Sequence, residues 1–310
     1  MKRILVIGSS NTDMVIRVDR IPRPGETVLG GKFSMTPGGK GANQAVAAAR
    51  AGGSVALIAR VGSDVFGTRA LVGFRKEGLD VGHVSRDRQV ASGVALIFVD
   101  RKAENSIGVA SGANSRCSPA DIRRAAKAIQ SAACILIQLE IPMETVHAAV
   151  SLAARSAIPV ILNPAPAQRL DAKLLRRVFM ITPNEMEAEA LTGIPADRPA
   201  TAEKAAKRLL RLGVKNVVMT LGSRGALIAN AEGVCLVPVF KVQPVDTTAA
   251  GDVFNGTLAV ALVEGCPLPE AVRFANAAAA ISVTRQGAQP SAPTRREIDR
   301  LISRYPGRRY

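Results

Sequence analysis

Short apolar runs of strand length alternate with alanine-rich stretches of helix length through most of this 310-residue chain. The apolar runs predict strands at residues 4–7, 55–60, 134–139, 160–162, 180–182 and 217–220. Between them, residues 41–50, 119–132, 143–155 and 202–212 have the composition of helices. This alternation is typical of an α/β fold: a doubly wound, mainly parallel sheet with helices on both faces. In such sheets ligands gather at the carboxyl ends of the strands.

Two segments interrupt this alternation and predict antiparallel hairpins. Residues 15–18 pair with 26–35, and residues 93–99 pair with 104–109, as strands of alternating polarity. We expect a single domain spanning 1–310, into which lid strands from about 13–36 and 92–110 are inserted. The two insertions would combine into a small β-sheet lid beside the strand ends.

The composition disfavours several classes of protein. The formal charge of +16 is compatible with nucleic-acid binding, but the basic residues are dispersed and aromatic residues make up only 3%. Four scattered cysteines and two histidines favour neither a disulfide framework nor a zinc site. No apolar run approaches the roughly 20 residues of a membrane span. The first apolar run is too short for a signal peptide, so we expect a cytoplasmic protein.

The segment from Asp246 to Gly256, DTTAAGDVFNG, leads small residues into an apolar helix. Small side chains let backbone N–H groups face outward at a helix start, where the helix dipole favours an anion. Asp252 in this turn could accept a proton from an attacking hydroxyl. Alternatively, Asp252 only caps the helix and Gly251 serves the turn, and the residues alone do not separate these two readings.

The segment from Pro37 to Ala45, PGGKGANQA, runs into an alanine-rich helix. Its glycines let the backbone approach a ligand, while Lys40 and Asn43 can bind hydroxyl groups. It is not a Walker A loop, because Gly41 stands at the required Ser/Thr position. It is not a dinucleotide fingerprint either, because Gln44 replaces the last glycine.

Polar side chains follow several of the predicted strands. Asn11 and Asp13 lie in a loop-like stretch after the first strand, where they either bind vicinal hydroxyls or form an Asx-type turn. Glu140 follows the strand at 134–139, and Asn184 and Glu187 follow the one at 180–182. The run TLGSRG at 220–225 ends another strand in a glycine turn.

Together these motifs resemble the ribokinase family, a branch of the phosphofructokinase-B group of carbohydrate kinases. The resemblance runs from residue 4 to about 302 and includes GGKGANQA at 38–45, NPAPA at 163–167, Asn184-x-x-Glu187, TLGSxG at 220–225 and DTxAAGD at 246–252. The last motif is the most specific. The run GGKGANQ favours this branch over fructokinases, adenosine kinases and sugar-acid kinases.

The resemblance implies transfer of the ATP γ-phosphoryl group to the 5-hydroxyl of D-ribose. It gives Asp252 the role of catalytic base and forms an anion hole from Ala249, Ala250 and Gly251. The implied sugar-binding residues are Asn11, Asp13, Gly39, Lys40, Asn43, Glu140 and Asp252. The implied nucleotide-binding residues are Asn184, Thr220, Gly222, Ser223, Gly225, Gly251 and Asn276.

The resemblance also implies Mg²⁺, K⁺ and a partner subunit. Glu187 would hold Mg²⁺ through water. Mostly backbone oxygens would hold K⁺, from Asp246, Thr248, Ser282, Arg285, Gly287 and Ser291. A homodimer would form through the lid sheets. Two alternatives stay open: a kinase for deoxyribose, another sugar or a nucleoside, and a binding protein that kept the fold without catalysis.

Overall fold

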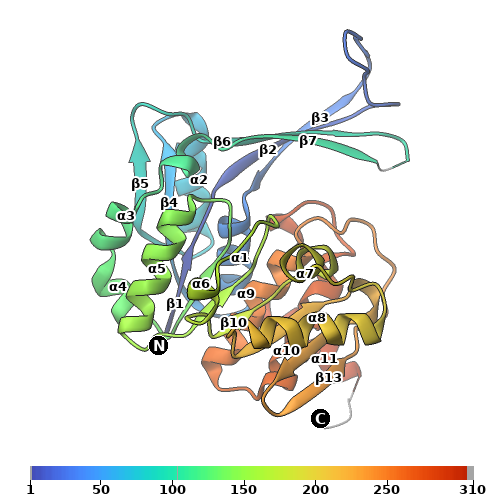
Figure 1. Cartoon of the computed structure of the whole chain (residues 1–310). Coiled ribbons are helices and arrows are strands. Elements are labelled where there is room, and N and C mark those ends of the chain that lie inside the picture. The colour runs from blue at the N-terminus through green and yellow to red at the C-terminus, as the bar shows by residue number, and fades with distance from the viewer. Residues whose placement is uncertain (1, 103, 306–310) are drawn as a thin grey trace.

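The computed structural model describes residues 2–102 and 104–305 of the chain. A nine-stranded sheet runs through it in the order β13-β12-β11-β10-β9-β8-β1-β4-β5 (Figure 1). Its strands are β1 (Arg3–Ile7), β4 (Ser54–Gly62), β5 (Asp80–Asp87), β8 (Cys134–Ile137), β9 (Val160–Leu162), β10 (Met180–Ile181), β11 (Asn216–Thr220), β12 (Ala226–Asn230) and β13 (Gly233–Val237). The strands from β5 across to β11 pair in parallel, and β12 and β13 add an antiparallel edge.

Helices cover both faces of this sheet, as the sequence predicts. One apolar core lies beneath α1 (Lys40–Arg50), α2 (Val65–Lys76), α9 (Ala250–Glu264), α10 (Leu268–Ser282) and α11 (Arg295–Arg304). The other lies beneath α3 (Pro119–Arg124), α4 (Ala126–Gln130), α5 (Met143–Arg155), α6 (Ala172–Leu175), α7 (Glu185–Thr192) and α8 (Pro199–Arg211). The predicted helix at 119–132 is in fact two helices, which meet at Ala125.

Strand β1 lies between β4 and β8, so the order of connection reverses beside it. The chain first builds β4 and β5 on one side, and then returns to build β8 to β11 on the other. A doubly wound sheet opens a crevice at such a point, outside the carboxyl ends of the strands. The polar residues that follow β1, β8, β9 and β10 therefore converge on one crevice.

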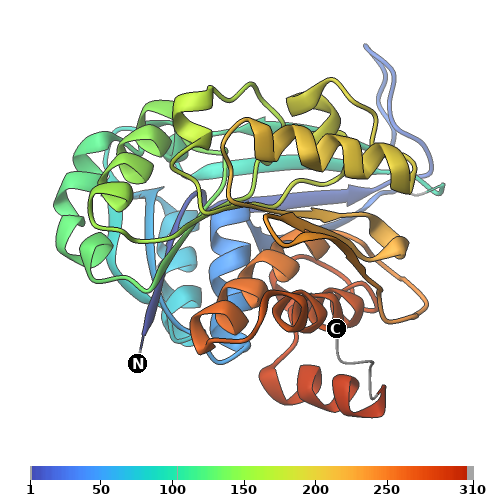
Figure 2. The same cartoon turned by 60° about the horizontal axis from the view of Figure 1, so that its bottom comes forward.

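A second, four-stranded sheet projects from the body of the molecule (Figures 1 and 2). It contains β2 (Asn11–Arg17), β3 (Lys32–Gly38), β6 (Gly93–Val99) and β7 (Asn105–Ala110) in the order β3-β2-β6-β7. The predicted hairpins β2–β3 and β6–β7 are confirmed, and β2 pairs with β6 in parallel to join them. The prediction that Asn11 and Asp13 lie in a loop is wrong: they are on β2, where alternate residues face the same side.

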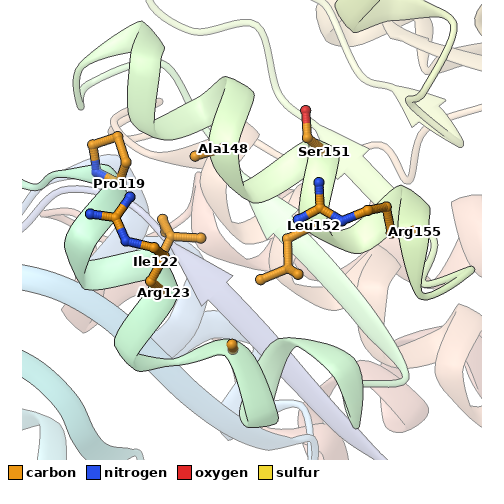
Figure 3. Close-up of a pocket in the computed structure, with 8 residues that line it drawn as sticks. Pro119, Ile122, Arg123, Ala148, Ser151, Leu152 and Arg155 are labelled. Carbon is orange, nitrogen blue, oxygen red and sulfur yellow. The ribbon is translucent and has the colours of Figure 1, made fainter.

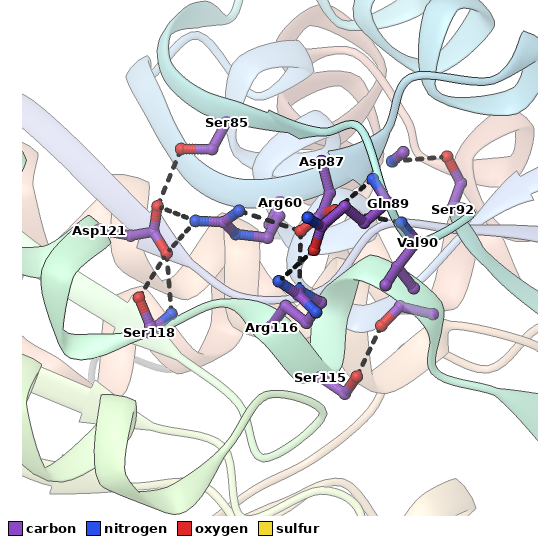
Figure 4. Close-up of polar contacts among 12 residues, drawn as sticks. Arg60, Ser85, Asp87, Gln89, Val90, Ser92, Ser115, Arg116, Ser118 and Asp121 are labelled. Atoms are coloured by element: carbon purple, nitrogen blue, oxygen red, sulfur yellow. Dashed lines mark hydrogen bonds and ion pairs between the residues drawn. The ribbon is translucent and has the colours of Figure 1, made fainter.

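A buried ionic cluster fixes the route from the large sheet into the small one (Figure 4). Arg60, at the end of β4, donates to Asp87 at 3.1 Å and to Asp121 at 2.9 and 3.0 Å. Both carboxylates are almost inaccessible, with side chains 4% and 1% exposed. Asp87 also accepts from the backbone of Gln89 and Val90, so the loop that leads into β6 is held at its origin.

Candidate active site

The carboxylate of Asp252 lies at the start of α9, facing the start of α1. Asn43 Nδ2 donates to its Oδ2 and Gln44 Nε2 donates to its Oδ1, each at 2.9 Å. Asp252 is only 7% exposed, yet both of its oxygens meet polar groups from the 37–45 segment. Ala249 is the N-cap residue of α9 and no side chain caps the helix, so the reading of Asp252 as a cap is wrong.

Burial raises the pKa of Asp252, while the charge of Lys40 and the hydrogen bonds from Asn43 and Gln44 act to lower it. A carboxylate in such surroundings is held in a fixed direction and is a better proton acceptor than a solvated one. This environment suits a general base.

Backbone N–H groups beside this carboxylate are free to bind an anion. Ala249 adopts a left-handed conformation, with φ at 59°, and this turns the chain sharply into α9. Within the described residues, the N–H groups of Ala249, Gly251 and Asp252 donate to no protein oxygen, whereas that of Ala250 donates to Thr247. Gly251 is exposed. The arrangement can therefore hold a phosphoryl group next to Asp252.

Three charged side chains gather at the junction of the two sheets. Lys40 Nζ lies 3.9 Å from Glu140 Oε1, and Glu140 Oε2 accepts from the Lys40 backbone at 3.0 Å. Asp13 packs so closely on Gly38 that a Cβ at Gly38 would lie 2.1 Å from its carboxylate. Burial, with the charges of Glu140 and Asp252, raises the pKa of Asp13 to about 6, although Lys40 opposes the shift.

Asn11 completes this group, and a hydrogen bond from Asn114 fixes the orientation of its side chain. Asn114, which is 2% exposed, donates to Asn11 Oδ1 at 2.7 Å and accepts from the Ser10 backbone at 2.9 Å. The Nδ2 group of Asn11 is left to serve a ligand. Asn43 Oδ1 is likewise buried without a partner among the described residues. An unpaired buried acceptor is costly, so a hydroxyl donor at this point would be stabilising.

The predicted nucleotide residues follow the next strands of the sheet. Asn184 caps α7, where its side chain and that of Glu187 bond each other's backbone at 2.8 and 2.9 Å. Asn184 also forms an isolated parallel bridge to Thr220 at the end of β11. Gly222 and Ser223 are exposed in the short 3₁₀ turn that follows, and Gly225 closes this turn.

Asn276 lies on α10 and binds the backbone at the end of β13. Its amide nitrogen donates to the carbonyl oxygens of Val237 at 3.1 Å and Pro238 at 3.2 Å. It therefore fixes the loop that leaves β13. Its side-chain oxygen is the atom that remains to meet a ligand.

The residues expected around K⁺ come from two segments that the structure brings together. Asp246 accepts from the N–H groups of Thr248 and Gly287, each at 2.9 Å. Burial acts to raise the pKa of Asp246, but these hydrogen bonds hold it below its ordinary value. The carbonyl oxygens of Asp246, Thr248, Arg285, Gly287 and Ser291 accept no hydrogen bond from the described residues. This set of free oxygens fits a hard cation. Ser282, the last residue of α10, differs from the others because its carbonyl oxygen accepts from the Arg285 N–H at 3.0 Å.

A metal centre built only from side chains is not present in residues 2–102 and 104–305. No group of three or more His, Cys, Asp or Glu residues that could hold a metal occurs there. Glu187 is 8% exposed and is occupied by its cap, so it fits Mg²⁺ only as one outer contact. Mg²⁺ commonly keeps several waters and binds substrate phosphates in this way.

Two further features of the surface bear on the choice of site. A shallow cavity of about 330 Å³ lies between α3, α4 and α5, lined by apolar side chains and by Arg123 and Arg155 (Figure 3). No predicted site residue lines this cavity. In the described part of the chain, no helix has both the length and the apolarity needed to cross a bilayer.

The structure thus brings Asp252, Asn43, Lys40, Glu140 and Asp13 close to one another, and it adds residues to which the sequence assigned no role. Ser9 donates to Glu140, Asn114 orients Asn11, and a buried group of amides surrounds Gln44. The motif containing Asn163 was recognised without a function for it. Gln138 is a polar residue in the otherwise apolar predicted strand at 134–139, and this is the one feature of the sequence that could have pointed to a role for it.

Comparison with known proteins agrees with this geometry. The model of the pfkB family of carbohydrate kinases matches residues 1–295. The chain is 46% identical to the ribokinase of Haemophilus influenzae over 296 residues, covering 96% of this chain and 97% of the relative. It is 38% identical to the deoxyribokinase of Salmonella typhi, covering 97% and 98% respectively. The structure of the ribokinase of Arabidopsis thaliana complexed with ribose and ATP superimposes with a TM-score of 0.90 at 31% identity, covering 97% of this chain and 98% of that chain.

Proposed function

The chain belongs to the pfkB family of carbohydrate kinases, and we propose that it transfers the γ-phosphoryl group of ATP to the 5-hydroxyl of D-ribose. The members of this family are carbohydrate kinases, so phosphorylation of a sugar is the activity expected of the chain. The choice of ribose is supported by the relatives named ribokinase and by the motif GGKGANQ at 38–44.

One observation carries the proposal: the Asp252 carboxylate lies at the start of α9, where three N–H groups have no partner among the described residues, and within hydrogen-bond distance of Asn43. In the reaction, Asp252 accepts the proton of the sugar 5-hydroxyl while the oxygen of that hydroxyl attacks the γ-phosphorus. The new P–O bond forms as the bond to the β-phosphate oxygen breaks, and ADP leaves. The N–H groups of Ala249, Gly251 and Asp252 stabilise the negative charge on the transferring group, whereas that of Ala250 is engaged by Thr247.

The sugar would lie between Asp252 and the junction of the two sheets. Asp13, Lys40 and Glu140 supply charged groups for its hydroxyls, while Asn11 and Asn43 supply an amide donor and an unpaired acceptor. Gly39, with φ at 87°, permits the close backbone approach on this side. Such interactions position the 5-hydroxyl for in-line attack.

The nucleotide would lie along the ends of β10, β11 and α9. Asn184, Thr220, Gly222, Ser223, Gly225, Gly251 and Asn276 are the residues proposed to contact it. When bound with the phosphates, Mg²⁺ neutralises charge that develops on them. Glu187 is the residue proposed to hold its hydration water.

K⁺ would occupy the carbonyl oxygens from the 246–248 and 282–291 segments. When bound there, it stabilises the turn that presents the free N–H groups. Replacing K⁺ with a large organic cation should therefore lower the rate of phosphoryl transfer. An equal rate in both ions would contradict this part of the proposal.

The four-stranded sheet is proposed to act as a lid and as the contact surface of a homodimer. Its exposed apolar side chains include Phe33 at 62%, Leu96 at 54% and Val109 at 57% exposure. Exposed apolar side chains gathered on one sheet favour association. Sedimentation of the chain and of the variant Phe33→Lys/Leu96→Lys tests this; a monomeric parent chain would exclude the dimer. The need for ATP favours a cytoplasmic location.

A second acceptor is kept because one relative is a deoxyribokinase. Deoxyribose lacks the 2-hydroxyl, so kcat/KM for ribose against deoxyribose separates the two activities. A preference for deoxyribose would correct the substrate and leave the kinase chemistry in place. No phosphorylation of any sugar or nucleoside in an acceptor panel would instead support a binding protein.

The decisive experiment is Asp252→Asn, assayed by ADP formation with ribose. Loss of the general base should lower kcat by about 10²–10⁴-fold, with little change in the affinity for ATP. Glu264→Gln is the matched control, because it removes an exposed carboxylate at the other end of α9. If Asp252→Asn turns over ribose at a rate near that of the unaltered chain, Asp252 is not the base.

A further inference from the structure

Gln44 has every hydrogen-bonding atom of its side chain engaged, although it is completely buried. Its Nε2 donates both to Asp252 Oδ1 at 2.9 Å and to Asn163 Oδ1 at 3.0 Å. Its Oε1 accepts from Gln138 Nε2. Gln138 is also completely buried, and Asn163 is 6% exposed.

The amide network continues until it returns to the start of α9. Asn163 Nδ2 donates to the carbonyl oxygen of Thr182 at 3.1 Å, and Thr182 Oγ1 donates to Asn255 Oδ1. Asn255 Nδ2 then donates to the carbonyl oxygen of Gly251 at 2.8 Å. The network therefore ties β8, β9, β10 and α1 to the turn that carries Asp252.

This network permits only one orientation of the Gln44 amide. After a half-turn, the Gln44 oxygen would face Asp252 Oδ1 and Asn163 Oδ1, and its NH₂ group would face the NH₂ group of Gln138. Two oxygen pairs would then be opposed in a buried space, where unpaired polar atoms are most costly, and turning Gln138 as well would relieve only the nitrogen pair. Asn163, held by the Thr182 carbonyl, thus determines which atom Gln44 presents to Asp252, and Gln138 adds a donor to Gln44 Oε1, although Gln138 Oε1 has no partner among the described residues.

We propose that Gln44, locked by Gln138 and Asn163, is a positioning residue that directs the Asp252 carboxylate at the acceptor hydroxyl and stabilises its negative form. This inference rests on the proposed function, since it needs Asp252 to be the base. Gln44 itself does not have to touch the substrate.

The other charges around Asp252 come from four elements. They are Lys40 on α1, Asp13 on β2, Glu140 after β8 and Glu187 on α7. Replacing Gln44 with an apolar residue leaves these charges in place and removes one donor from the carboxylate. The pKa of Asp252 then rises, so more alkaline solution is needed to obtain the active base.

The test measures single-turnover phosphoryl transfer to the sugar from pH 5 to pH 9 for three variants. Gln44→Met should reduce the rate at pH 7 by about 10–100-fold and move the acid limb of the profile upward by about one pH unit. The lost activity should return as pH rises. Within the network Gln138 bonds only to Gln44, so Gln138→Met should shift the acid limb in the same direction by a smaller amount. If Gln44→Met fails to fold, Gln138→Met provides the test.

Thr257→Val is the matched control. It deletes a buried hydrogen bond to Val253 on the same helix, one turn beyond the base. It should lower stability without moving the acid limb. A loss that is uniform across pH in the glutamine variants, or no loss at all, overturns the positioning role.

Failure of this inference is separable from failure of the proposed function. If Asp252→Asn is inactive but the glutamine variants keep an unshifted limb, only the positioning role is lost. If Asp252→Asn remains active, the base assignment is wrong and the positioning role is overturned with it. If a sugar other than ribose is the better acceptor, the same measurements are made with that sugar.

Discussion

Gly256→Ala should destabilise the protein, although alanine is the better helix former. Gly256 lies within α9, where it packs against α1 without a side chain. A Cβ at this position would lie 2.4 Å from the Gln44 carbonyl oxygen and 2.9 Å from both Ala47 Cβ and Ala48 N. These neighbours are backbone atoms and a short side chain, so they cannot rotate away, and the two helices must move apart.

The size of the effect follows from two opposed contributions. Replacing a helical glycine with alanine gains about 0.5–1 kcal/mol. Overpacking a close contact costs about 1–3 kcal/mol. Because three atoms would lie within 3.0 Å of the added Cβ, we expect a cost in the upper part of that range and a net loss of about 1–2 kcal/mol in the free energy of unfolding. Activity should fall about tenfold as well, since α1 carries the donors to Asp252 and small displacements of reacting groups are costly.

Gly73→Ala is the matched control, because Gly73 is an exposed helical glycine of α2 with nothing within 4 Å of an added Cβ. It should gain about 0.5–1 kcal/mol and keep full activity. Urea unfolding of both variants measures whether the free energy of unfolding falls for Gly256→Ala and rises for Gly73→Ala, and sugar kinase assays measure their activity. A Gly256→Ala protein as stable as the unaltered chain would show that α1 and α9 are not held at this spacing.

Three other changes test separate parts of the structure. The pKa of Asp13 is raised to about 6, against 3.8 when unfolded, so ionisation of Asp13 destabilises the fold as pH rises from 4 to 6. At pH 8 the free energy of unfolding of Asp13→Asn should therefore exceed that of the unaltered chain by up to about 3 kcal/mol, and near pH 3 the two should be equal. Asp13→Asn should also bind the sugar more weakly. Asn114→Ala should raise KM for the sugar about 3–10-fold with kcat within twofold, since Asn11 loses its orientation and Ser10 its backbone contacts while Asp252 keeps its own partners; an unchanged KM in steady-state assays would contradict it. Arg60→Met leaves the buried Asp87 and Asp121 with only the more exposed Arg116 and Arg124 as charged partners, and it should cost about 3 kcal/mol in urea unfolding; a cost below 1 kcal/mol would mean that the cluster in Figure 4 is not energetically coupled.

The sequence predicted the large sheet well because most of its strands are buried on both faces. Runs such as Val160–Leu162 are continuously apolar, and helices of regular composition separate them. Strands β5, β12 and β13 were not predicted. In β5 and β13 most residues are partly exposed, and β12 is a buried run at the antiparallel edge, where no helix marks its boundaries. Local patterns do not identify such strands, because their pairing depends on neighbours that are distant in the chain.

The candidate site was predicted where a motif combined chemistry with a strand end or helix start. Asp252 could be read as a cap or as a base. The structure removes the first reading, because Ala249 is the N-cap residue of α9, and the second stays a proposal. Asn114 and Gln138 were missed for a related reason. Each acts on another side chain across the fold, 103 residues away for Asn114 and 94 for Gln138, and no local spacing records that relationship.

The distance in sequence between Asn43 and Asp252, 209 residues, has a consequence for synthesis of the protein. A chain that leaves the ribosome from its N-terminus completes α1 long before α9 exists. Until then, the alanine surface of α1 that α9 will cover faces water, and Asn43 and Gln44 have no carboxylate to bind. Under the proposed mechanism, a nascent or prematurely terminated chain therefore lacks the base for phosphoryl transfer, and the exposed apolar face of α1 is a surface that chaperones can bind.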